Sequence, residues 1–176
     1  MNAMEIERKY EIMYIPGELT DFPCKKIEQG YLCHNPTIRI RKSNQDYYLT
    51  YKSKTDVKEK KGGAIIRNEV ELPLTKEAYQ SLKAKTDDNM VLKKRYLIPL
   101  EGGLTVELDI FEGVLEGLIF AEVEFPDVEA ADAFVPPEWF GAELSADKRY
   151  TNYHLSKLSS YQELLIKNDN TDGKNM

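Results

Sequence analysis

Three charged side chains near the N-terminus could do chemistry together. As a β-strand, the segment Glu5-Ile6-Glu7-Arg8-Lys9 places Glu5, Glu7 and Lys9 on one face, because side chains alternate across a strand. Two neighbouring carboxylates repel each other unless a cation lies between them, and the lysine beside them suggests an anionic companion. A divalent metal ion that holds a polyphosphate meets both demands. An exposed strand with a solvated charged face is the alternative, which these residues alone leave open.

Pairs of chemically similar side chains, two positions apart, recur along the chain. They are Arg39/Arg41, Glu69/Glu71, Lys93/Arg95, Glu107/Asp109 and Glu122/Glu124. Arginine pairs suit bidentate contacts to phosphate oxygens. Carboxylate pairs without histidine or cysteine ligands suit hard ions that prefer oxygen, so Mg²⁺ or Mn²⁺ is expected before zinc. The repetition therefore favours a binding site over a surface that is merely solvated.

Strands must position these pairs, since each pair alternates with apolar residues. Strands are expected over residues 4–13, 26–33, 37–42, 47–54, 64–74, 89–100, 104–112 and 118–125. Helices are expected over residues 75–85, 127–134 and 146–165. Thr75 is the expected N-cap of the first helix, and Ser145 that of the last. The chain is therefore expected to be α+β, with mainly antiparallel strands.

Each predicted strand has one charged face and one apolar face, and two architectures satisfy this pattern. In an ordinary sheet, the charged face points outward into solvent. In a closed barrel, the charged face points inward, while helices and neighbouring strands cover the apolar outer face. Periodicity alone does not choose between these two architectures.

Size and composition limit the functions open to the chain. It has 176 residues, enough for one domain with a core, and a net charge of −6. Nucleic-acid binding is not expected, because it normally requires a basic face. The two cysteines have no metal-type spacing, and no apolar run reaches transmembrane length. With no signal peptide either, the sequence predicts a cytoplasmic protein without a membrane partner.

Several other side chains are interpreted as structural. His34 and His154 have no carboxylate or second histidine at ligand spacing, so both are interpreted as bystanders. The lysine-rich loop over residues 55–63 is expected to be solvated. Three tyrosines are expected to pack in the wall rather than stack on a base: Tyr31, Tyr48 and Tyr96.

The order of the motifs resembles the CYTH domain of the triphosphate tunnel metalloenzymes. The opening Glu-x-Glu-x-Lys of residues 5–9 is similar to the signature strand of that family. Further similar segments are the arginine strand 37–41, the lysine strand 49–52, the acidic strand 67–71, the Lys-x-Arg strand 93–96, the late acidic strands 107–109 and 121–125, and the closing segment 144–152. Together and in order, these short motifs cover residues 4 to about 158.

The resemblance implies a fold and a set of site residues. The fold is an eight-stranded antiparallel β tunnel with a charged interior and a few flanking helices. It would form one domain over residues 1–167, followed by a disordered polar tail over residues 168–176. The implied phosphate-binding residues are Lys9, Arg39, Arg41, Lys52, Arg67, Lys93, Arg95 and Lys148. The implied ligands of Mg²⁺ or Mn²⁺ are Glu5, Glu7, Glu69, Glu71, Asp109, Glu122 and Glu124. The implied catalytic residues are Glu5, Glu7, Lys9 and Lys52. Glu107 could simply balance Arg67 or Lys93.

The resemblance also implies an activity, namely metal-dependent hydrolysis of inorganic triphosphate or of a related organic triphosphate. Cations and metal would neutralise the phosphate chain in a partly dry tunnel, so that water can attack it. Two other enzymes remain open, a class IV adenylate cyclase that makes cyclic AMP and pyrophosphate, and a thiamine triphosphatase. A non-catalytic polyphosphate or nucleotide sensor is less expected, because a binder needs fewer metal ligands. The sequence leaves a homodimer possible.

Overall fold

A computed structural model of the protein describes residues 2–54, 64–86 and 89–169. The predicted lysine-rich loop over residues 55–63 lies outside these residues. So do residues 170–176 of the predicted tail.

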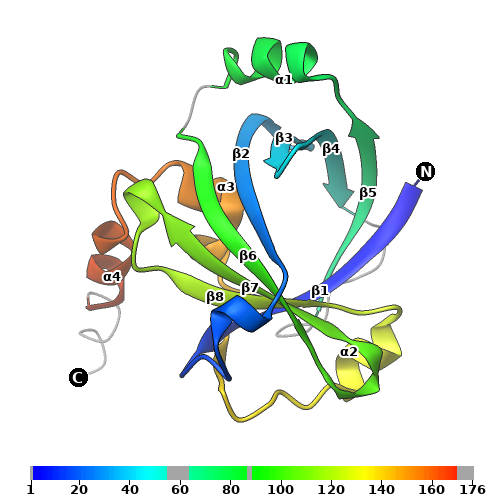
Figure 1. Cartoon of the computed structure of the whole chain (residues 1–176), viewed down its shortest axis with the longest axis vertical. Helices are drawn as coiled ribbons and strands as arrows, with labels where there is room; N and C mark the ends of the chain where they lie inside the picture. The colour runs from blue at the N-terminus through cyan, green and yellow to red at the C-terminus, as the bar shows by residue number, and fades with distance from the viewer. Residues whose placement is uncertain (1, 55–63, 87–88, 170–176) are drawn as a thin grey trace.

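The described strands form one antiparallel sheet that closes on itself. The strands are β1 (Asn2–Ile12), β2 (Cys24–His34), β3 (Thr37–Ser43), β4 (Asp46–Lys54), β5 (Ile65–Pro73), β6 (Val91–Pro99), β7 (Thr105–Glu112), β8 (Ile119–Glu124) and β9 (Phe140–Glu143). They pair in the order β5-β4-β3-β2-β6-β7-β8-β1-β9, and β1 also pairs with β5 (Figure 1). This confirms the predicted eight-stranded barrel. The short strand β9, which the sequence did not predict, pairs with the C-terminal end of β1, at Tyr10 and Ile12.

Strand register brings the charged pairs together inside this barrel. Lys9 lies opposite Glu122 across β1 and β8, and Arg95 lies opposite Asp109 across β6 and β7. The alternating residues of the same strands, such as Ile6, Leu108 and Val123, belong to an apolar cluster on the outer side of the wall. Since side chains alternate across a strand, the charged faces point inward. Of the two architectures, the barrel with a charged interior is therefore the one observed.

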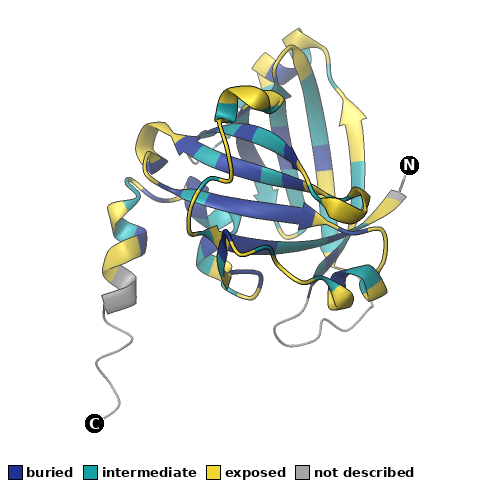
Figure 2. Cartoon of the chain, turned by 60° about the horizontal axis from the view of Figure 1, so that its bottom comes forward, coloured by how far each residue is buried: buried dark blue, intermediate teal, exposed yellow. Residues whose placement is uncertain are grey.

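The outer apolar cluster fastens two covering segments to the barrel. Helix α2 (Val128–Ala133) contributes Ala131, and the segment that follows contributes Trp139 and Phe140. The Asp127 side chain caps α2 by accepting a hydrogen bond from the Ala130 N–H. Burying a large apolar side chain such as that of Phe140 stabilises the fold by about 1.5–3 kcal/mol. Most buried residues lie on the barrel strands, and exposed residues gather on the surrounding helices and loops (Figure 2).

A second apolar cluster fills part of the barrel interior. Phe111 and Phe120 share the inner faces of their strands with Asp109 and Glu122, and they pack with Leu155 and other residues near helix α3 (Asn152–Ser156). The charged part of the interior is thus bounded by an apolar plug that α3 helps to build.

The predicted helix over residues 146–165 is wrong. The structure has a 3₁₀ turn η4 (Lys148–Tyr150), then α3, then a separate helix α4 (Gln162–Asp169). Thr151 interrupts the segment, because its extended backbone and its side chain, which accepts from the His154 N–H, begin a new helix there. Ser145 caps no helix; its Oγ accepts from the Lys9 N–H at 2.9 Å instead. Helix α4 reaches Asp169, inside the segment assigned to the tail.

The remaining short elements connect strands. Helix α1 (Lys76–Lys83) is capped by Thr75, as predicted, through a hydrogen bond from the Ala78 N–H to the Thr75 hydroxyl. Three 3₁₀ turns are η1 (Leu19–Asp21), η2 (Glu101–Gly103) and η3 (Gly113–Leu115). No helix in the described part of the chain is long and apolar enough to cross a membrane.

Candidate active site

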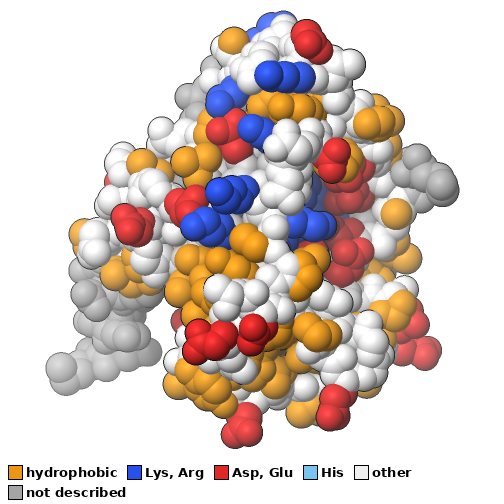
Figure 3. All heavy atoms as spheres, in the orientation of Figure 1, with side chains coloured by type: hydrophobic (Ala, Val, Ile, Leu, Met, Phe, Trp, Pro, Cys, Tyr) orange, Lys and Arg blue, Asp and Glu red, His pale blue; other side chains and the backbone are white. Residues whose placement is uncertain are grey.

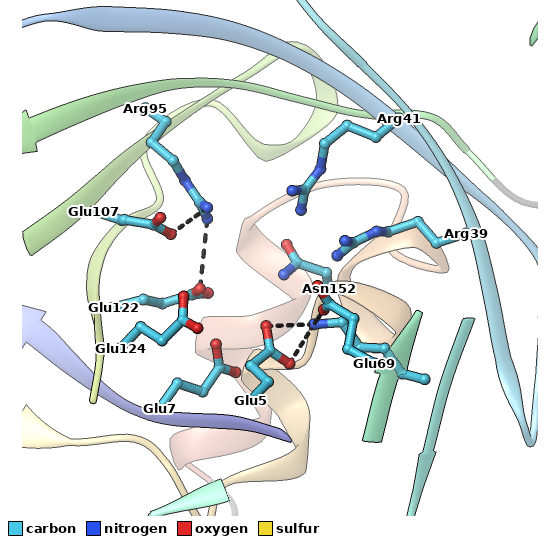
Figure 4. A pocket seen from close by; sticks show the side chains of 11 residues that line it. Glu5, Glu7, Arg39, Arg41, Glu69, Arg95, Glu107, Glu122, Glu124 and Asn152 are labelled. Carbon is cyan, nitrogen blue, oxygen red and sulfur yellow. Dashed lines mark hydrogen bonds and ion pairs between the residues drawn. The ribbon is translucent and has the colours of Figure 1, made fainter. Parts of the chain in front are cut away.

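A cavity lies inside the barrel and is lined almost entirely by charged side chains. The lining residues are Glu5, Glu7, Arg39, Arg41, Lys52, Glu69, Arg95, Glu107, Glu122, Glu124 and Asn152 (Figure 4). Seven strands contribute to it, which explains why residues so far apart in sequence meet. Acidic and basic side chains also meet near the middle of the face seen in Figure 3.

Two arginines lie across this cavity from two of its carboxyl groups. The guanidinium groups of Arg39 and Arg41 lie on one side, and the carboxylates of Glu7 and Glu124 lie on the other, as Figure 4 shows. A ligand that combined negative groups with a cation would therefore meet opposite charge on both sides.

Two arginines supply the positive charge on the arginine side of the cavity. Among the ion pairs formed by described residues, none involves Arg39 or Arg41. Arg39 donates to the Thr50 hydroxyl at 3.2 Å, while its buried Nε has no hydrogen-bond partner. Within the described residues, the Arg41 guanidinium donates to the Gln29 side-chain oxygen at 3.1 Å. Burial, together with Arg39 and Arg95, lowers the pKa of Arg41 to about 10. These features favour an anion between the two guanidiniums.

The acidic side carries more negative charge than its neighbours neutralise. Burial and the nearby carboxylates of Glu122 and Glu5 raise the pKa of Glu7 to about 8. Burial also raises the pKa of Glu124, as do Glu5 and Glu107. A cation bound here would relieve this repulsion.

Lys52 lies between the two sides. Its Nζ is 2.6 Å from Glu5 Oε2 and 3.2 Å from Glu69 Oε2. Burial and Arg39 act to lower the pKa of Lys52, but the carboxylates around it outweigh them and raise that pKa. Lys52 is therefore held in its charged form between Glu5 and Glu69.

Asp109 and Lys93 lie on the inner faces of β7 and β6 but are covered by their neighbours, and neither lines the cavity. Both side chains have no exposed surface, and Lys93 Nζ donates to Asp109 Oδ2 at 2.5 Å. Arg95 donates to both oxygens of Asp109, at 2.7 and 2.8 Å. These partners hold the pKa of Asp109 below its ordinary value, although burial opposes them. Asp109 thus holds the Arg95 side chain in position, whereas the resemblance to the CYTH domain implied that Asp109 is a metal ligand. Glu107 pairs with Arg95, and the expectation that it balances Arg67 or Lys93 is wrong.

Lys9 contacts both the charged cavity and the apolar plug. Its Nζ donates to the Tyr150 carbonyl at 2.7 Å, lies 3.4 Å from Glu122 Oε1 and sits 4.5 Å from the centre of the Phe120 ring. Opposite charge from Lys9 and Arg95 lowers the pKa of Glu122 despite its burial. Glu122 is therefore ionised where Glu7, beside it, retains its proton near neutral pH.

Two further cavities share residues with the central one. The cavity toward α3 shares Glu7, Arg39, Lys52 and Asn152 with it, and adds Lys9, Tyr31, His34, Thr37, Ile65, Arg67, Thr151 and Tyr153. The other shares Arg41, Arg95 and Glu107, and adds Lys25, Ile27, Ser43, Asn44, Asp46, Tyr48 and Glu71. The three cavities adjoin one another at the shared residues and together line the tunnel interior.

Comparison with known proteins agrees with this geometry. The family model described as the CYTH domain matches residues 3–160, which is most of the chain. The chain belongs to the CYTH family. A relative described as an inorganic triphosphatase, from Nitrosomonas europaea, is 39% identical over 157 residues, covering 86% of this chain and 96% of the relative. An inorganic triphosphatase from Acetivibrio thermocellus is 34% identical, with coverages of 87% and 93%.

Solved structures agree with the CYTH assignment. The crystal structure of the inorganic triphosphatase NE1496 is 35% identical in sequence, with a TM-score of 0.61. The similarity covers 86% of this chain and 93% of that one.

The carboxylates of this CYTH domain suit a metal ion that arrives with its substrate. In the described residues, no three His, Cys, Asp or Glu side chains form a ready-made metal site. Mg²⁺, however, is usually held by one or two carboxylates, by waters and by substrate phosphates, and seldom by an all-protein cage. The raised pKa of Glu7 marks the place where a cation would be favoured. The donors facing the cavity there are oxygens, which fits Mg²⁺ or Mn²⁺.

Most of the predicted site residues of the CYTH domain meet in the tunnel, with three exceptions. Lys93 and Asp109 are fully buried on the inner faces of β6 and β7, and Lys148 is exposed in η4; none of the three lines these cavities. Sequence reasoning missed Asn152 and Tyr153, which α3 carries to the tunnel, and it treated His34 as a bystander although His34 lines the cavity toward α3. The His34 and Tyr153 rings lie 3.4 Å apart, centre to centre. Asn152 does stand in the closing motif, the one signal that could have pointed to it.

Proposed function

We propose that this CYTH protein is a metal-dependent hydrolase of inorganic triphosphate. The observation that carries the proposal is a single cavity in which Arg39 and Arg41, which form no ion pair with other described residues, lie across from acidic groups that include Glu7 with its raised pKa. A triphosphate with a bound divalent ion matches both sides. The relatives named inorganic triphosphatase support the same substrate.

The arginines and lysines have the task of binding and orienting the phosphate chain. Arg39 and Arg41 would contact phosphate oxygens on one side of the cavity, and Arg95, braced by Asp109, would hold the chain from the next strands. Lys9, Lys52 and Arg67 line the cavity toward α3, where a terminal phosphoryl group would meet further positive charge. Because the tunnel is lined by fixed cations, the negative charge of the chain is offset without solvent having to reorganise.

The carboxylates have the task of holding Mg²⁺ or Mn²⁺. Glu7, Glu122 and Glu124 face the cavity together, and Glu5 and Glu69 can join them when Lys52 turns to phosphate. When bound, the ion supplies positive charge at the phosphoryl oxygens and makes its bound water more acidic. Glu71 lies farther away, in the cavity on the side of Arg41. Asp109 is assigned the positioning of Arg95 and Lys93.

An organic triphosphate is the second candidate substrate. The cavity toward α3 is lined by Tyr31, His34 and Tyr153, which give one end of the tunnel aromatic surface. Such a surface can accept the ring of a nucleotide or of thiamine. The central cavity holds no aromatic side chain, which favours the inorganic substrate.

One panel of reactions separates these candidates. The protein is incubated with Mg²⁺ or Mn²⁺ and with tripolyphosphate, ATP or thiamine triphosphate, and phosphate, pyrophosphate and cyclic AMP are measured. Phosphate release from tripolyphosphate, abolished by EDTA, is the expected result. Cyclic AMP with pyrophosphate would instead identify a cyclase, and binding without turnover a sensor. The cytoplasmic localisation and the homodimer stay predictions, which fractionation and light scattering can test.

A further inference from the structure

We propose that Asn152 binds the substrate, its carboxamide donating a hydrogen bond to a phosphate oxygen of the triphosphate. The inference rests on the proposed function and adds to it a ligand that comes from outside the barrel strands. Asn152 is the first residue of α3 and lines both the central cavity and the cavity toward α3. In Figure 4 its side chain points into the cavity near Arg39.

Lys93 determines which end of the Asn152 amide faces the tunnel. Lys93 Nζ lies 3.4 Å from Asn152 Oδ1. An ammonium group donates hydrogen bonds and accepts none, so the oxygen of the amide must face Lys93. The NH₂ group is then the end directed toward the cavity, and it can only donate. Lys93 is itself held in place by Asp109, with no exposed side-chain surface. The buried Lys93 therefore orients Asn152 so that its neutral NH₂ donor faces the tunnel.

The helix that carries Asn152 is firmly anchored. Leu155 and Leu158 are buried in the apolar plug at 0% and 3% exposure. The Asn89 N–H donates to the Ser156 carbonyl at 3.1 Å, and the Asn89 side chain donates to the Leu158 carbonyl at 3.1 Å. Thr151 caps the helix one residue before Asn152. The side chain is thus fixed before a ligand arrives, which reduces the entropy lost on binding.

The groups around Asn152 select an anion as its partner. Three charged residues line both of these cavities together with Asn152, and two of them are cations: Arg39, Lys52 and the single acid Glu7. A neutral amide donor beside these cations adds a directional contact without increasing their mutual repulsion. A phosphate oxygen bound by Arg39 would therefore be the natural acceptor for Asn152.

Asn152→Asp tests this inference because it separates the two contacts of the side chain. Aspartate has nearly the same shape and keeps an oxygen for Lys93, but it removes the donor and places negative charge in the cavity. Asn152→Ala removes both contacts. Asn68→Asp is the matched control, because Asn68 is exposed on the outer side of β5 and the change in net charge is the same.

The measurements are tripolyphosphate affinity by calorimetry in EDTA, KM and kcat with Mg²⁺, and the thermal midpoint without ligand. Asn152→Ala should weaken affinity roughly 10- to 100-fold, and Asn152→Asp at least as much, with KM rising in parallel. The midpoint of Asn152→Asp should not fall, and Asn68→Asp should bind like the wild type. A well-folded Asn152→Asp protein with wild-type affinity and KM would overturn the inference. If Asn152→Asp does not fold, wild-type affinity in a folded Asn152→Ala protein would overturn it equally. A wild-type protein that neither binds nor hydrolyses tripolyphosphate would instead refute the proposed function.

Discussion

The proton on Glu7 gives a quantitative prediction about metal binding. With its pKa raised to about 8, the carboxyl group is mostly protonated at pH 7 in the metal-free tunnel. A divalent ion binds the carboxylate form, so the proton must leave as the ion enters. We therefore expect close to one proton to be released for each ion bound at pH 7, and fewer as the pH rises above 8.

Isothermal titration of Mn²⁺ or Mg²⁺ into the protein measures this release directly. The apparent enthalpy is compared in buffers of different ionisation enthalpy, such as PIPES and Tris, at pH 7 and at pH 9. The slope against ionisation enthalpy gives the number of protons. Between pH 6 and 8 the affinity should rise roughly tenfold per pH unit, and it should level off above pH 8.

Two variants make the assignment to Glu7 testable. Glu7→Gln should abolish the proton release and weaken metal binding, because it removes the titrating group and a ligand. Glu28→Gln is the control, since Glu28 is paired with Lys83 at 2.8 Å and accepts from Tyr79 at 2.7 Å, away from the residues that line the tunnel. Metal binding without proton release at pH 7, or release that survives in Glu7→Gln, would refute the reasoning.

Three other perturbations have outcomes that the contacts predict. The metal-free protein should lose stability as the pH rises from about 5 to 8, by up to about 1.4 kcal/mol per pH unit, because folded Glu7 keeps a proton that the unfolded chain has released. Denaturant unfolding at several pH values measures this change. An unfolding free energy that does not vary with pH would contradict it. Arg39→Ala should weaken tripolyphosphate binding by about 2 kcal/mol in calorimetry while leaving the thermal midpoint nearly unchanged, since no ion pair is lost. Asp109→Asn should destabilise the fold by about 3–5 kcal/mol in urea, because Lys93 and Arg95 would be left buried without it; an unchanged unfolding midpoint would argue against the bracing role.

The sequence could predict the strands and their charged faces because both follow from local alternation. Arg39 and Arg41 share a strand face because they are two positions apart, and so do Glu122 and Glu124. This holds for any arrangement of the neighbouring strands. That these faces point inward did not follow from periodicity. It came from the resemblance of the motifs to the CYTH family, which orders the strands into a closed barrel.

The roles of individual acids could not be separated by sequence. Asp109 and Glu124 look alike in their motifs, but the register of β6 and β7 places Asp109 opposite Arg95, while Glu124 lies opposite Glu7. The first pairing neutralises a carboxylate and the second creates repulsion. Register across strands is a long-range property, which a single sequence does not encode in readable form.

The C-terminal segment was misjudged for a related reason. Leu155 and Leu158 are spaced as on one helix face, but Leu164 would lie on the opposite face of a single continuous helix. Two separate helices allow all three leucines to be buried in the same apolar plug. Asn152 and Tyr153 reach the tunnel on the first of these two helices. No periodic pattern in the sequence indicates this role, because Asn152 and Tyr153 lie in the first turn of a short helix and are not part of an alternating strand.

A structure of the protein with Mn²⁺ and tripolyphosphate, or a slowly hydrolysed analogue, tests the central claim most directly. The account predicts phosphate density between Arg39 and Arg41 and anomalous Mn²⁺ density beside Glu7, Glu122 or Glu124, both inside the barrel. Triphosphate and metal bound only on the outer surface, with the tunnel holding water alone, would contradict it.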